Sequence, residues 1–365
     1  MCSTQIGVLH HIEITSLGEV PLIDATQERR LQRLLQSCGH NSHTHLYYLG
    51  DKKWFWDSEH EACIVYRSLG NRRIALGDPL GKPEAIPRVI GQFMNHCREH
   101  GYIPAFYQAK SSFLQLYKQY GLQYAKIGEE AQVDLAKFHL HGKAWLKLRG
   151  RINKLKRAGF TFAVLHPPFE DRFLDRLHKI SGEWLGERKE KSFSVGSFSR
   201  EYVNRFPVAV LIGPDGEYEA FATLGGDPPP SLPDSRDAAV PRQITVDLMR
   251  YTKACPHGAM DVLFASLFLW AQEHRYDFCS LGMAPLANVN DLLFAKWVYK
   301  YGNKFYNFKG LYDYKNKFAP AWKDVYLVYP PSGLPVTLTV LMLMIHTAPG
   351  NRKPAKDKML SNFVS

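Results

Sequence analysis

The chain has 365 residues, of which 45% are hydrophobic and 13% aromatic, and its formal net charge is +11. This length is sufficient for two domains with a substantial core, and the composition excludes a disordered or fibrous protein. The positive charge favours partners that carry phosphate, either nucleic acid or an anionic membrane surface.

The first part of the chain, residues 1–138, is predicted to form an N-terminal domain with a helical lead-in. Strand-like runs with Gly and Asp turns indicate an antiparallel meander, and alternating helices and strands follow it. The predicted helices cover 26–38, 85–100 and 111–120, and the predicted strands cover 45–49, 53–56, 62–67, 73–76, 103–107, 124–127 and 131–135. This order predicts a mixed α/β fold.

The candidate sites for a metal ion or a disulfide are a histidine-rich stretch in this part and the cysteines of the whole chain. The stretch from His40 to His45, H-N-S-H-T-H, could bind a metal, but we interpret it as a polar loop. The six cysteines are scattered and form no C-x-x-C pair, which is typical of reduced thiols in a cytoplasmic setting. We expect no metal and no cofactor.

The second part, residues 139–365, is predicted to form a C-terminal domain that repeats the same order of elements. The predicted helices cover 142–158, 169–184, 259–274 and 291–301, and the predicted strands cover 160–165, 208–212, 217–224, 244–246, 277–281 and 305–308. A Pro- and Asp-rich loop is predicted at 225–240, another loop at 282–286 and a basic segment at 312–323. The apolar stretch 334–348 is too short to span a bilayer, and we favour a buried helix over one that lies in the membrane interface.

The predicted helix 142–158 is the sharpest electrostatic feature of the chain. It carries seven cations and no acidic residue, and Trp145, Leu148, Ile152 and Leu155 form an apolar stripe at helical spacing. Surface helices normally interleave both charges, so this pattern favours contact with a phosphate backbone. The candidate phosphate-binding residues on this helix, which would contact tRNA if the family resemblance described below holds, are Lys143, Lys147, Arg151, Lys154 and Arg157.

The stretch 243–261 contains an acid and a base three residues apart, Asp247 and Arg250, where a predicted strand ends. The pair is either an ordinary ion pair or part of a functional site. Gly258, just before a predicted helix, could help to bind an anion at the helix N-terminus. Farther along, lysines and aromatic residues interleave from 296 to 323, a pattern that suits RNA ends, a lipid headgroup region, or a packed core with lysines at its rim.

Several motifs together resemble the cytosolic catalytic domain of the MprF-type phosphatidylglycerol lysyltransferases. They are V-D-L-M-R-Y (246–251), G-A-M-D-V-L-F-A (258–265), F-C-S-L-G-M-A-P-L (278–286), Y-N-F-K-G-L-Y-D-Y-K-N-K-F-A-P-A-W (306–322), A-L-G-D-P-L-G (75–81) and E-W-L-G-E-R-K-E-K-S-F-S-V-G-S-F (183–198). The resemblance covers about residues 45 to 347 and implies two acetyltransferase-like (GNAT) folds in tandem, joined by the basic helix.

The resemblance also implies an activity and its residues. The expected reaction moves an aminoacyl group from aminoacyl-tRNA to the glycerol hydroxyl of phosphatidylglycerol, with lysyl transfer commoner than alanyl transfer. The implied catalytic residues are Asp247, Arg250 and either Lys315 or Lys317. The matching motifs also make Glu183, Trp184 and Tyr251 candidate substrate-binding residues.

Family members usually carry a transmembrane flippase portion ahead of this domain, which residues 1–365 lack, so we expect a soluble homologue or an excised domain. The flippase could be a separate protein or a fused one. The implied location is cytoplasmic, at the inner face of the bacterial membrane, with a role in resistance to cationic antimicrobial peptides. The alternatives are a FemX-like transferase that acts on a peptidoglycan precursor and a non-catalytic module that binds RNA or membrane.

Overall fold

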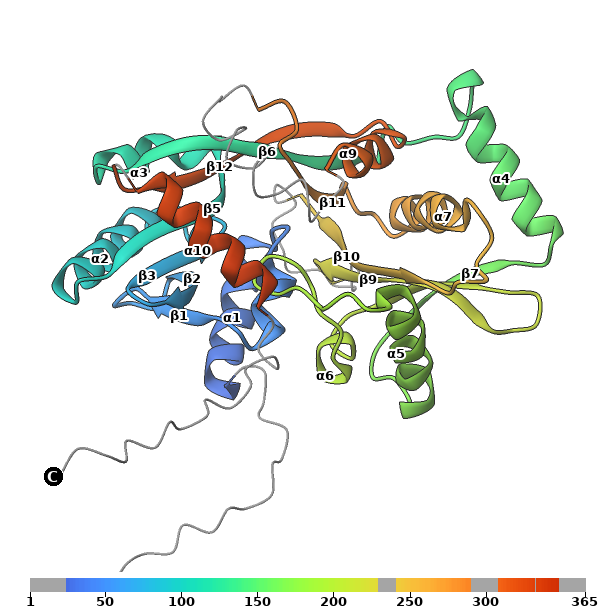
Figure 1. Ribbon diagram of the computed structural model, residues 1–365, viewed down its shortest axis with the longest axis horizontal. Coiled ribbons are helices and arrows are strands. Elements are labelled where there is room, and N and C mark those ends of the chain that lie inside the picture. The colour runs from blue at the N-terminus through green and yellow to red at the C-terminus, as the bar shows by residue number, and fades with distance from the viewer. Residues whose placement is uncertain (1–23, 229–240, 290–307, 332, 348–365) are drawn as a thin grey trace, which may run out of the picture.

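The computed structural model describes residues 24–228, 241–289, 308–331 and 333–347. One continuous sheet runs through the molecule in the strand order β1-β2-β3-β5-β12-β6-β11-β10-β9-β8-β7, with β4 paired to β2 (Figure 1). Helices pack on both faces of this sheet. The predicted mixed α/β fold is therefore confirmed.

The N-terminal half begins with helix α1 and the 3-10 helix η1, and a strand meander follows. Its elements are α1 (Ala25–Cys38), η1 (Thr44–Leu49), β1 (Lys53–Trp56), β2 (Ala62–Leu69), β3 (Arg72–Leu76), β4 (Leu80–Gly81), α2 (Ile86–Glu99), β5 (Ile103–Lys110), η2 (Ser111–Phe113), α3 (Leu114–Gln119) and β6 (Gln123–Asp134).

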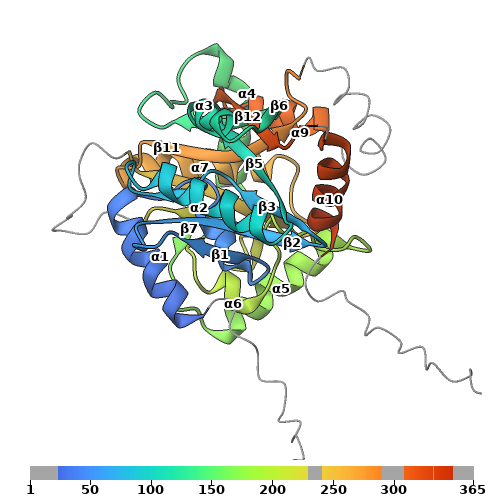
Figure 2. The same ribbon diagram turned by 90° about the vertical axis from the view of Figure 1, so that its left-hand side faces the viewer.

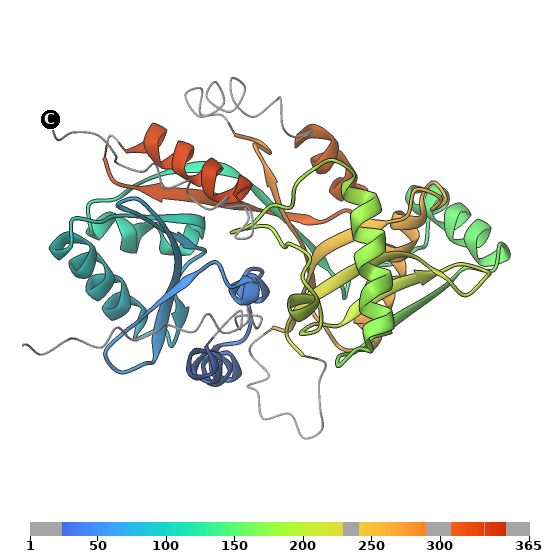
Figure 3. The same ribbon diagram turned by 60° about the horizontal axis from the view of Figure 1, so that its bottom comes forward.

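The C-terminal half begins with the basic helix, which lies at one end of the molecule (Figure 3). Its elements are η3 (Lys143–Trp145), α4 (Leu146–Arg157), β7 (Thr161–Leu165), α5 (Asp171–Leu185), α6 (Arg200–Val203), β8 (Val208–Ile212), β9 (Tyr218–Gly226), β10 (Gln243–Tyr251), α7 (Ala259–Glu273), β11 (Phe278–Pro285), α9 (Phe308–Asn316), β12 (Ala321–Tyr329) and α10 (Leu334–His346).

Alternating residues of the strands face opposite layers of helices, as the period of two in a β-strand requires. On β2, Ile64 packs in the cluster that contains Phe93 of α2, whereas Val65 packs in the cluster that contains Leu341 of α10. Apolar residues on both faces make β2 a nearly continuous hydrophobic run. This explains why its sequence shows no clear alternation of polar and apolar residues.

The two halves repeat one arrangement and exchange their last strands. In each half a helix joins a parallel pair of strands, β3 and β5 across α2, and β10 and β11 across α7. The next strand along the chain after each pair, β6 or β12, joins the sheet of the other half. Strand β12 pairs with β5, β6 pairs with β11, and β6 and β12 pair with each other. Strand β12 thus completes the sheet of the N-terminal half, while the division at residue 138 stays a prediction.

Helix α10 packs across β2 and β3 on the outside of the sheet (Figure 2). On the inner side of this helix Leu338, Leu341 and Met344 are buried. On its outer side Val336 and Leu343 are about half exposed. The preference for a buried helix is therefore correct for one face only. No helix in the described ranges has the length and apolar character needed to cross a bilayer.

Several predicted elements differ from the structure. Residues 45–49 form η1 rather than a strand, because consecutive residues Leu46 and Tyr47 are both buried and no period of two exists. The two strands predicted between 124 and 135 are one long strand, β6, and the loop predicted at 282–286 is mostly the end of β11. The helix predicted at 291–301 and most of the strand at 305–308 lie outside the described residues.

Candidate active site

The site begins where the parallel strands β10 and β11 separate. Their last paired residues are Thr245 and Ser280. Beyond them, β10 continues along β9 and β11 continues along β6, each with a register shift. Because both strands run in the same direction, Asp247 and Gly282, each two residues farther on, stand at matching positions on the two sides of the opening.

Asp247 is a buried carboxylate held by groups from three other segments. Its Oδ2 accepts a hydrogen bond from the Tyr202 hydroxyl (2.8 Å) and its Oδ1 accepts one from the Gly196 amide (3.1 Å). His45 Nε2 lies 3.6 Å from Oδ1. Burial acts to raise the pKa of Asp247, but His45, Tyr202 and Gly196 together outweigh it and hold the pKa below its usual value. The carboxylate is therefore ionised at neutral pH.

The segment from 186 to 199 wraps the site and is fixed by its own contacts. The Phe193 amide donates to Asp51 Oδ2 (2.8 Å), and the Ser192 amide donates to the Ile345 carbonyl of α10 (2.9 Å). At Gly196 an added Cβ would overlap both carboxylate oxygens of Asp247. Glycine at this position is what lets the backbone amide approach the carboxylate.

Arg250 belongs to a second cluster on the same strand. One of its terminal nitrogens lies 2.9 Å from Glu190 Oε2, and its guanidinium lies 4.1 Å from the Trp184 ring centre. Arg188 lies over the same ring at 4.2 Å. The Arg250 side chain is only 6% exposed, and its Nε has no hydrogen-bond partner among the described residues. A buried donor without a partner is suited to receive an anionic group.

Lys315 lies on the other side of the opening. Its Nζ donates to the carbonyls of Gly282 and Met283, at 2.9 Å each. Burial lowers the pKa of Lys315 to about 7, although Glu130 opposes this shift. As a neutral amine, Lys315 can donate both of its hydrogens to these carbonyls and still keep one lone pair to accept a proton.

Glu130 lies close enough to act electrostatically on both Lys315 and His43, which belong to opposite halves. Ser280 Oγ donates to Glu130 Oε1 (2.5 Å) and accepts from the Gly282 amide (3.1 Å), which supports the irregular backbone of β11. On the facing side, His43 Nε2 lies 2.8 Å from Gln108 Oε1. Burial lowers the pKa of His43, so this imidazole is neutral. The polar loop expected at 40–45 is present as far as His43, where η1 follows, but His43 and His45 are buried rather than solvated.

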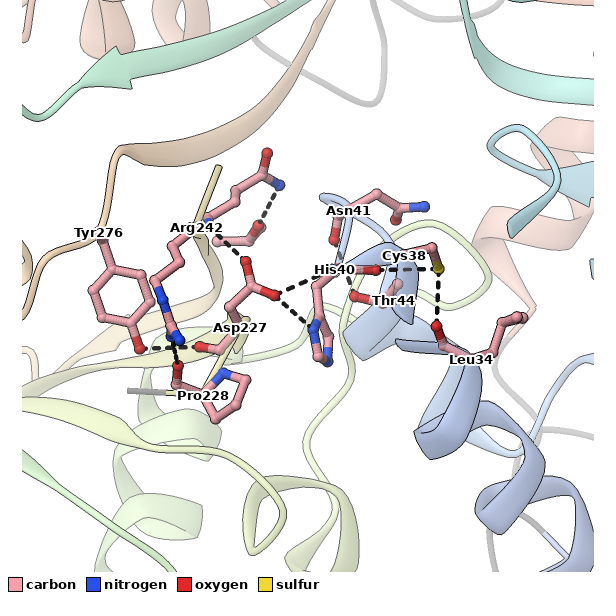
Figure 4. Close-up of polar contacts among 12 residues, drawn as sticks. Leu34, Cys38, His40, Asn41, Thr44, Asp227, Pro228, Arg242 and Tyr276 are labelled. Atoms are coloured by element: carbon pink, nitrogen blue, oxygen red, sulfur yellow. Dashed lines mark hydrogen bonds and ion pairs between the residues drawn. The ribbon is translucent and has the colours of Figure 1, made fainter. Parts of the chain in front are cut away.

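A carboxylate just after the end of β9 fixes the turn that precedes these histidines (Figure 4). Asp227 Oδ1 accepts from the His40 amide (3.1 Å) and lies 2.8 Å from His40 Nδ1. Its Oδ2 accepts from the amide of Gln243 (2.7 Å), the first residue of β10. The lead-in is therefore tied to the strand that carries Asp247. Gly225, whose added Cβ would overlap the His45 ring, leaves room for the histidine.

Lys317 lies at a different place, where α4, α7 and α9 meet. Its Nζ lies 3.4 Å from Asp261 Oδ1, and Arg151 forms an ion pair with Oδ2 of the same buried carboxylate. A Cβ at Gly258 would lie 2.8 Å from Arg151 Cδ, so this glycine makes room for the arginine at the start of α7. The structure thus brings together Arg151, Lys317 and Gly258, and groups Lys315 with the β10–β11 opening instead.

The remaining predicted residues are placed as follows. Lys143, Lys147, Lys154 and Arg157 are exposed, while Leu148 and Leu155 dock the basic helix on the body. A surface hollow is lined by Asn153, Lys156 and Arg157. Glu183 is half-buried on α5 beside Trp184, and Tyr251 is exposed at the end of β10.

Sequence reasoning missed the residues that hold the named ones. They are His45, Glu130, Glu190 and Tyr202, of which only the last two lie near each other in the sequence. His45 lies in the His40–His45 stretch, and Glu190 and Gly196 lie in the motif 183–198, so these three positions had been singled out without a role in the site. Tyr202 and Glu130 lie in no such motif. No group of three or more metal-ligating side chains occurs within the described residues.

Comparison with known proteins places this arrangement in context. A family model described as phosphatidylglycerol lysyltransferase, C-terminal, matches residues 32–329. The phosphatidylglycerol lysyltransferase of Bacillus subtilis (strain 168) is 36% identical over 353 residues, which cover 95% of this chain and 39% of the relative. The phosphatidylglycerol lysyltransferase of Staphylococcus xylosus is 34% identical over 305 residues, which cover 82% of this chain and 35% of that relative. The chain therefore spans between a third and two fifths of the length of these relatives.

Solved structures of lysylphosphatidylglycerol synthetases are also similar to this chain. The structure of L-PGS from Bacillus licheniformis superposes with a TM-score of 0.76 at 37% identity, covering 91% of this chain and all of that one. A chain described as the C-terminal domain of a lysylphosphatidylglycerol synthetase from Agrobacterium fabrum has a TM-score of 0.78 at 32% identity. The match covers 89% of this chain and 98% of that one. FemX, at a TM-score of 0.53, 9% identity and coverage of 87% and 98%, shares the fold alone.

Proposed function

Because the chain belongs to the phosphatidylglycerol lysyltransferase C-terminal family, we propose that it moves an aminoacyl group from aminoacyl-tRNA to the glycerol hydroxyl of phosphatidylglycerol. Lysine is the group we favour over alanine, since the named relatives are lysyltransferases. The observation that carries the proposal is the opening between β10 and β11, with the carboxylate of Asp247 on one side and the amine of Lys315 on the other.

The reaction is a transesterification that needs no further activation, because the aminoacyl ester is already reactive. The lipid hydroxyl oxygen attacks the ester carbonyl carbon, and the bond from that carbon to the terminal ribose oxygen of the tRNA breaks. The hydroxyl proton must be removed as the new ester forms, and the ribose oxygen must be protonated as it leaves. Net charge is conserved, so one group that accepts and then returns a proton is enough.

Lys315 is the residue that we assign to this proton transfer. A base with a pKa of about 7 is well matched to proton transfer at neutral pH. Asp247 is a poor base there, because its pKa lies below the usual carboxyl value. Lys317 is bound to Asp261 and is about half exposed, so we do not assign it to the chemistry.

Asp247 and Arg250 are assigned to the two charged substrate groups. The fixed negative charge of Asp247 orients the amino group of the aminoacyl ester, because its position is set by Tyr202 and Gly196 before substrate arrives. Arg250, held by Glu190 over Trp184, offers its unpartnered Nε to the lipid phosphate. Glu183 and Tyr251 flank this cluster and stay predicted substrate contacts.

The basic helix α4 is assigned to the tRNA acceptor stem. Lys143, Lys147, Lys154 and Arg157 are exposed and can reach phosphates, whereas Arg151 is ion-paired with Asp261 and serves first to dock the helix. Contacts of this kind give affinity without base readout, and they weaken steeply with salt. The wider role, a change of membrane charge that gives resistance to cationic antimicrobial peptides, and the partnership with a flippase are parts of the same proposal.

The test is a transfer assay on the chain itself. Labelled lysyl-tRNA and alanyl-tRNA are each incubated with phosphatidylglycerol vesicles, and lipid-soluble label is counted. Lysyl label in the lipid fraction is expected. Label on a muropeptide precursor instead would favour the FemX-like alternative, and binding of tRNA or vesicles without any transfer would favour a non-catalytic module.

A further inference from the structure

The outer face of α10 is an exposed apolar surface that the transfer chemistry does not use. Val336, Thr339, Val340 and Leu343 recur at helical spacing on it, and Val336 and Leu343 are 50% and 52% exposed. Thr339 Oγ1 donates to the Pro335 carbonyl (2.9 Å), so the polar atom of its side chain is satisfied within the helix. We call these four residues the α10 face.

The rest of α10 shows that the face is not a frayed end. Arg67 donates to the carbonyls of Met344 (2.6 Å) and Thr347 (2.9 Å), and the single hydroxyl hydrogen of Ser192 can reach either of the same two carbonyls. The last carbonyls of the helix, which a helix leaves without internal partners, are therefore bonded to the body of the protein. A rigid helix with an exposed apolar stripe is a feature of surfaces that bind a membrane or another protein.

Charge decides between these two occupants. Leu334–His346 contains no Asp, Glu, Lys or Arg. Arg67, which also pairs with Asp51, contacts its end, and Arg72 donates to Thr337 Oγ1 (3.3 Å). The segment bonded to its end exposes Glu187, Arg188 and Lys189, so cations outnumber acids around the helix. With a net charge of +11, a second copy of the chain would be repelled, whereas an anionic bilayer would be attracted.

We propose that the α10 face docks on the surface of an anionic phospholipid bilayer, with Val336 and Leu343 inserted among the upper acyl chains. The inference rests on the proposed function in one respect, since a transferase that modifies phosphatidylglycerol must meet its substrate at such a surface. The hydrogen bond from the Ser192 amide to Ile345 then links the docked helix to the segment that carries Glu190 and Gly196. Docking at α10 therefore places the Arg250 and Asp247 clusters next to the headgroup layer.

The test is co-sedimentation of the full chain with vesicles of phosphatidylglycerol. Leu343→Glu together with Val336→Glu should weaken binding by about tenfold or more, because two apolar side chains leave the acyl region and two anions approach an anionic surface. The matched control is Leu269→Glu, another exposed leucine, 38% exposed on α7, which should bind like the parent chain. Vesicles of phosphatidylcholine should bind the parent chain weakly.

A second readout separates docking from chemistry. Transfer to phosphatidylglycerol dispersed in detergent should be unchanged in the α10 double variant, while transfer to vesicles should fall with binding. If the parent chain transfers nothing in either form but the variant still loses vesicle binding, the proposed function fails and the docking surface stands. Unchanged vesicle binding by the double variant overturns the docking surface, and so does a parent dimer that the variant converts to a monomer.

Leu343→Trp tests the same surface without a charged substitution, so its result holds even if the charged variants misfold. Tryptophan is favoured at the membrane interface, so this substitution should retain or strengthen binding, and its emission should shift to the blue on addition of phosphatidylglycerol vesicles. The parent chain supplies the background from its own tryptophans. An emission spectrum that vesicles leave unchanged at position 343 contradicts the proposal.

Discussion

Asp247 and Arg250 lie three residues apart on β10, and each has its own partner. The carboxylate accepts from Tyr202 and Gly196, while the guanidinium pairs with Glu190 over Trp184. The ordinary ion pair that the spacing allowed is thus replaced by two separately fixed charges. Each partner comes from the region 184–202, so this one region positions both members of the motif.

Asp247→Asn should abolish most transfer while it leaves the fold in place. The amide keeps the shape of the carboxylate but loses the negative charge that we assign to the amino group, and loss of such a preorganised group costs roughly 10²–10³ in kcat. Lipid-soluble label from lysyl-tRNA measures this. Asp324→Asn, a 44% exposed acid that pairs with Lys126, is the control and should retain activity. Near-normal turnover in Asp247→Asn would refute the assignment.

Arg250→Lys tests geometry at constant charge. Lysine cannot form the planar stack on Trp184 together with the pair to Glu190, so kcat/KM for phosphatidylglycerol should fall by about tenfold or more. Arg73→Lys is a matched control, because Arg73 also lies over an aromatic ring, 3.6 Å from the centre of Tyr102 in the other half. Equal kinetics for both variants would mean that Arg250 acts as a charge alone.

Lys315→Met and Lys317→Met should behave differently with pH. Lys315 has its pKa lowered from 10.5 to about 7, so between these values the unfolded chain binds more protons than the folded chain. Stability therefore rises with pH across this window, and below it the cost of burying the charged lysine is fully present. Thermal unfolding should show this rise in the parent chain and in Lys317→Met, and a flatter profile in Lys315→Met.

The variants Lys315→Met and Lys317→Met also separate the roles of the two lysines in aminoacyl transfer. In the parent chain, kcat should increase as pH rises through about 7, since the neutral amine of Lys315 is the active form. Lys315→Met should lose this dependence along with most of the activity, while Lys317→Met should keep both. A reversal of the two results would move the proton transfer to Lys317.

Gly196→Ala should damage the site through a steric clash. The added methyl group would overlap the Asp247 carboxylate, so the segment must shift and its amide hydrogen bond is lost, at a cost of about 1–3 kcal/mol in unfolding free energy. Gly182→Ala, on the adjacent helix α5 with open space around its Cα, should stabilise the chain by about 0.5–1 kcal/mol. Denaturant unfolding measures the free energy of unfolding of both variants. Equal values would contradict the close approach of the backbone to Asp247 at Gly196.

Much of the local structure could be predicted from the sequence. The amphipathic helices α2 and α5 and the hairpin of β8 and β9 were all placed within a few residues, because their apolar periodicity is local. The burial of the His40–His45 stretch could not be predicted, for the opposite reason. Its polar composition suits a loop, but tertiary contacts with Asp227, Gln108 and Asp247 bury it.

The sequence by itself determined the mixed α/β class, the basic helix and the family motifs that contain Asp247, Arg250 and Lys315. Only the tertiary structure decided which groups act together. The exchange of β6 and β12 depends on pairing between strands about 200 residues apart, which no local pattern encodes. Likewise, Lys315 and Lys317 are two residues apart and chemically alike, and packing alone buries one at the β10–β11 opening and leaves the other on Asp261.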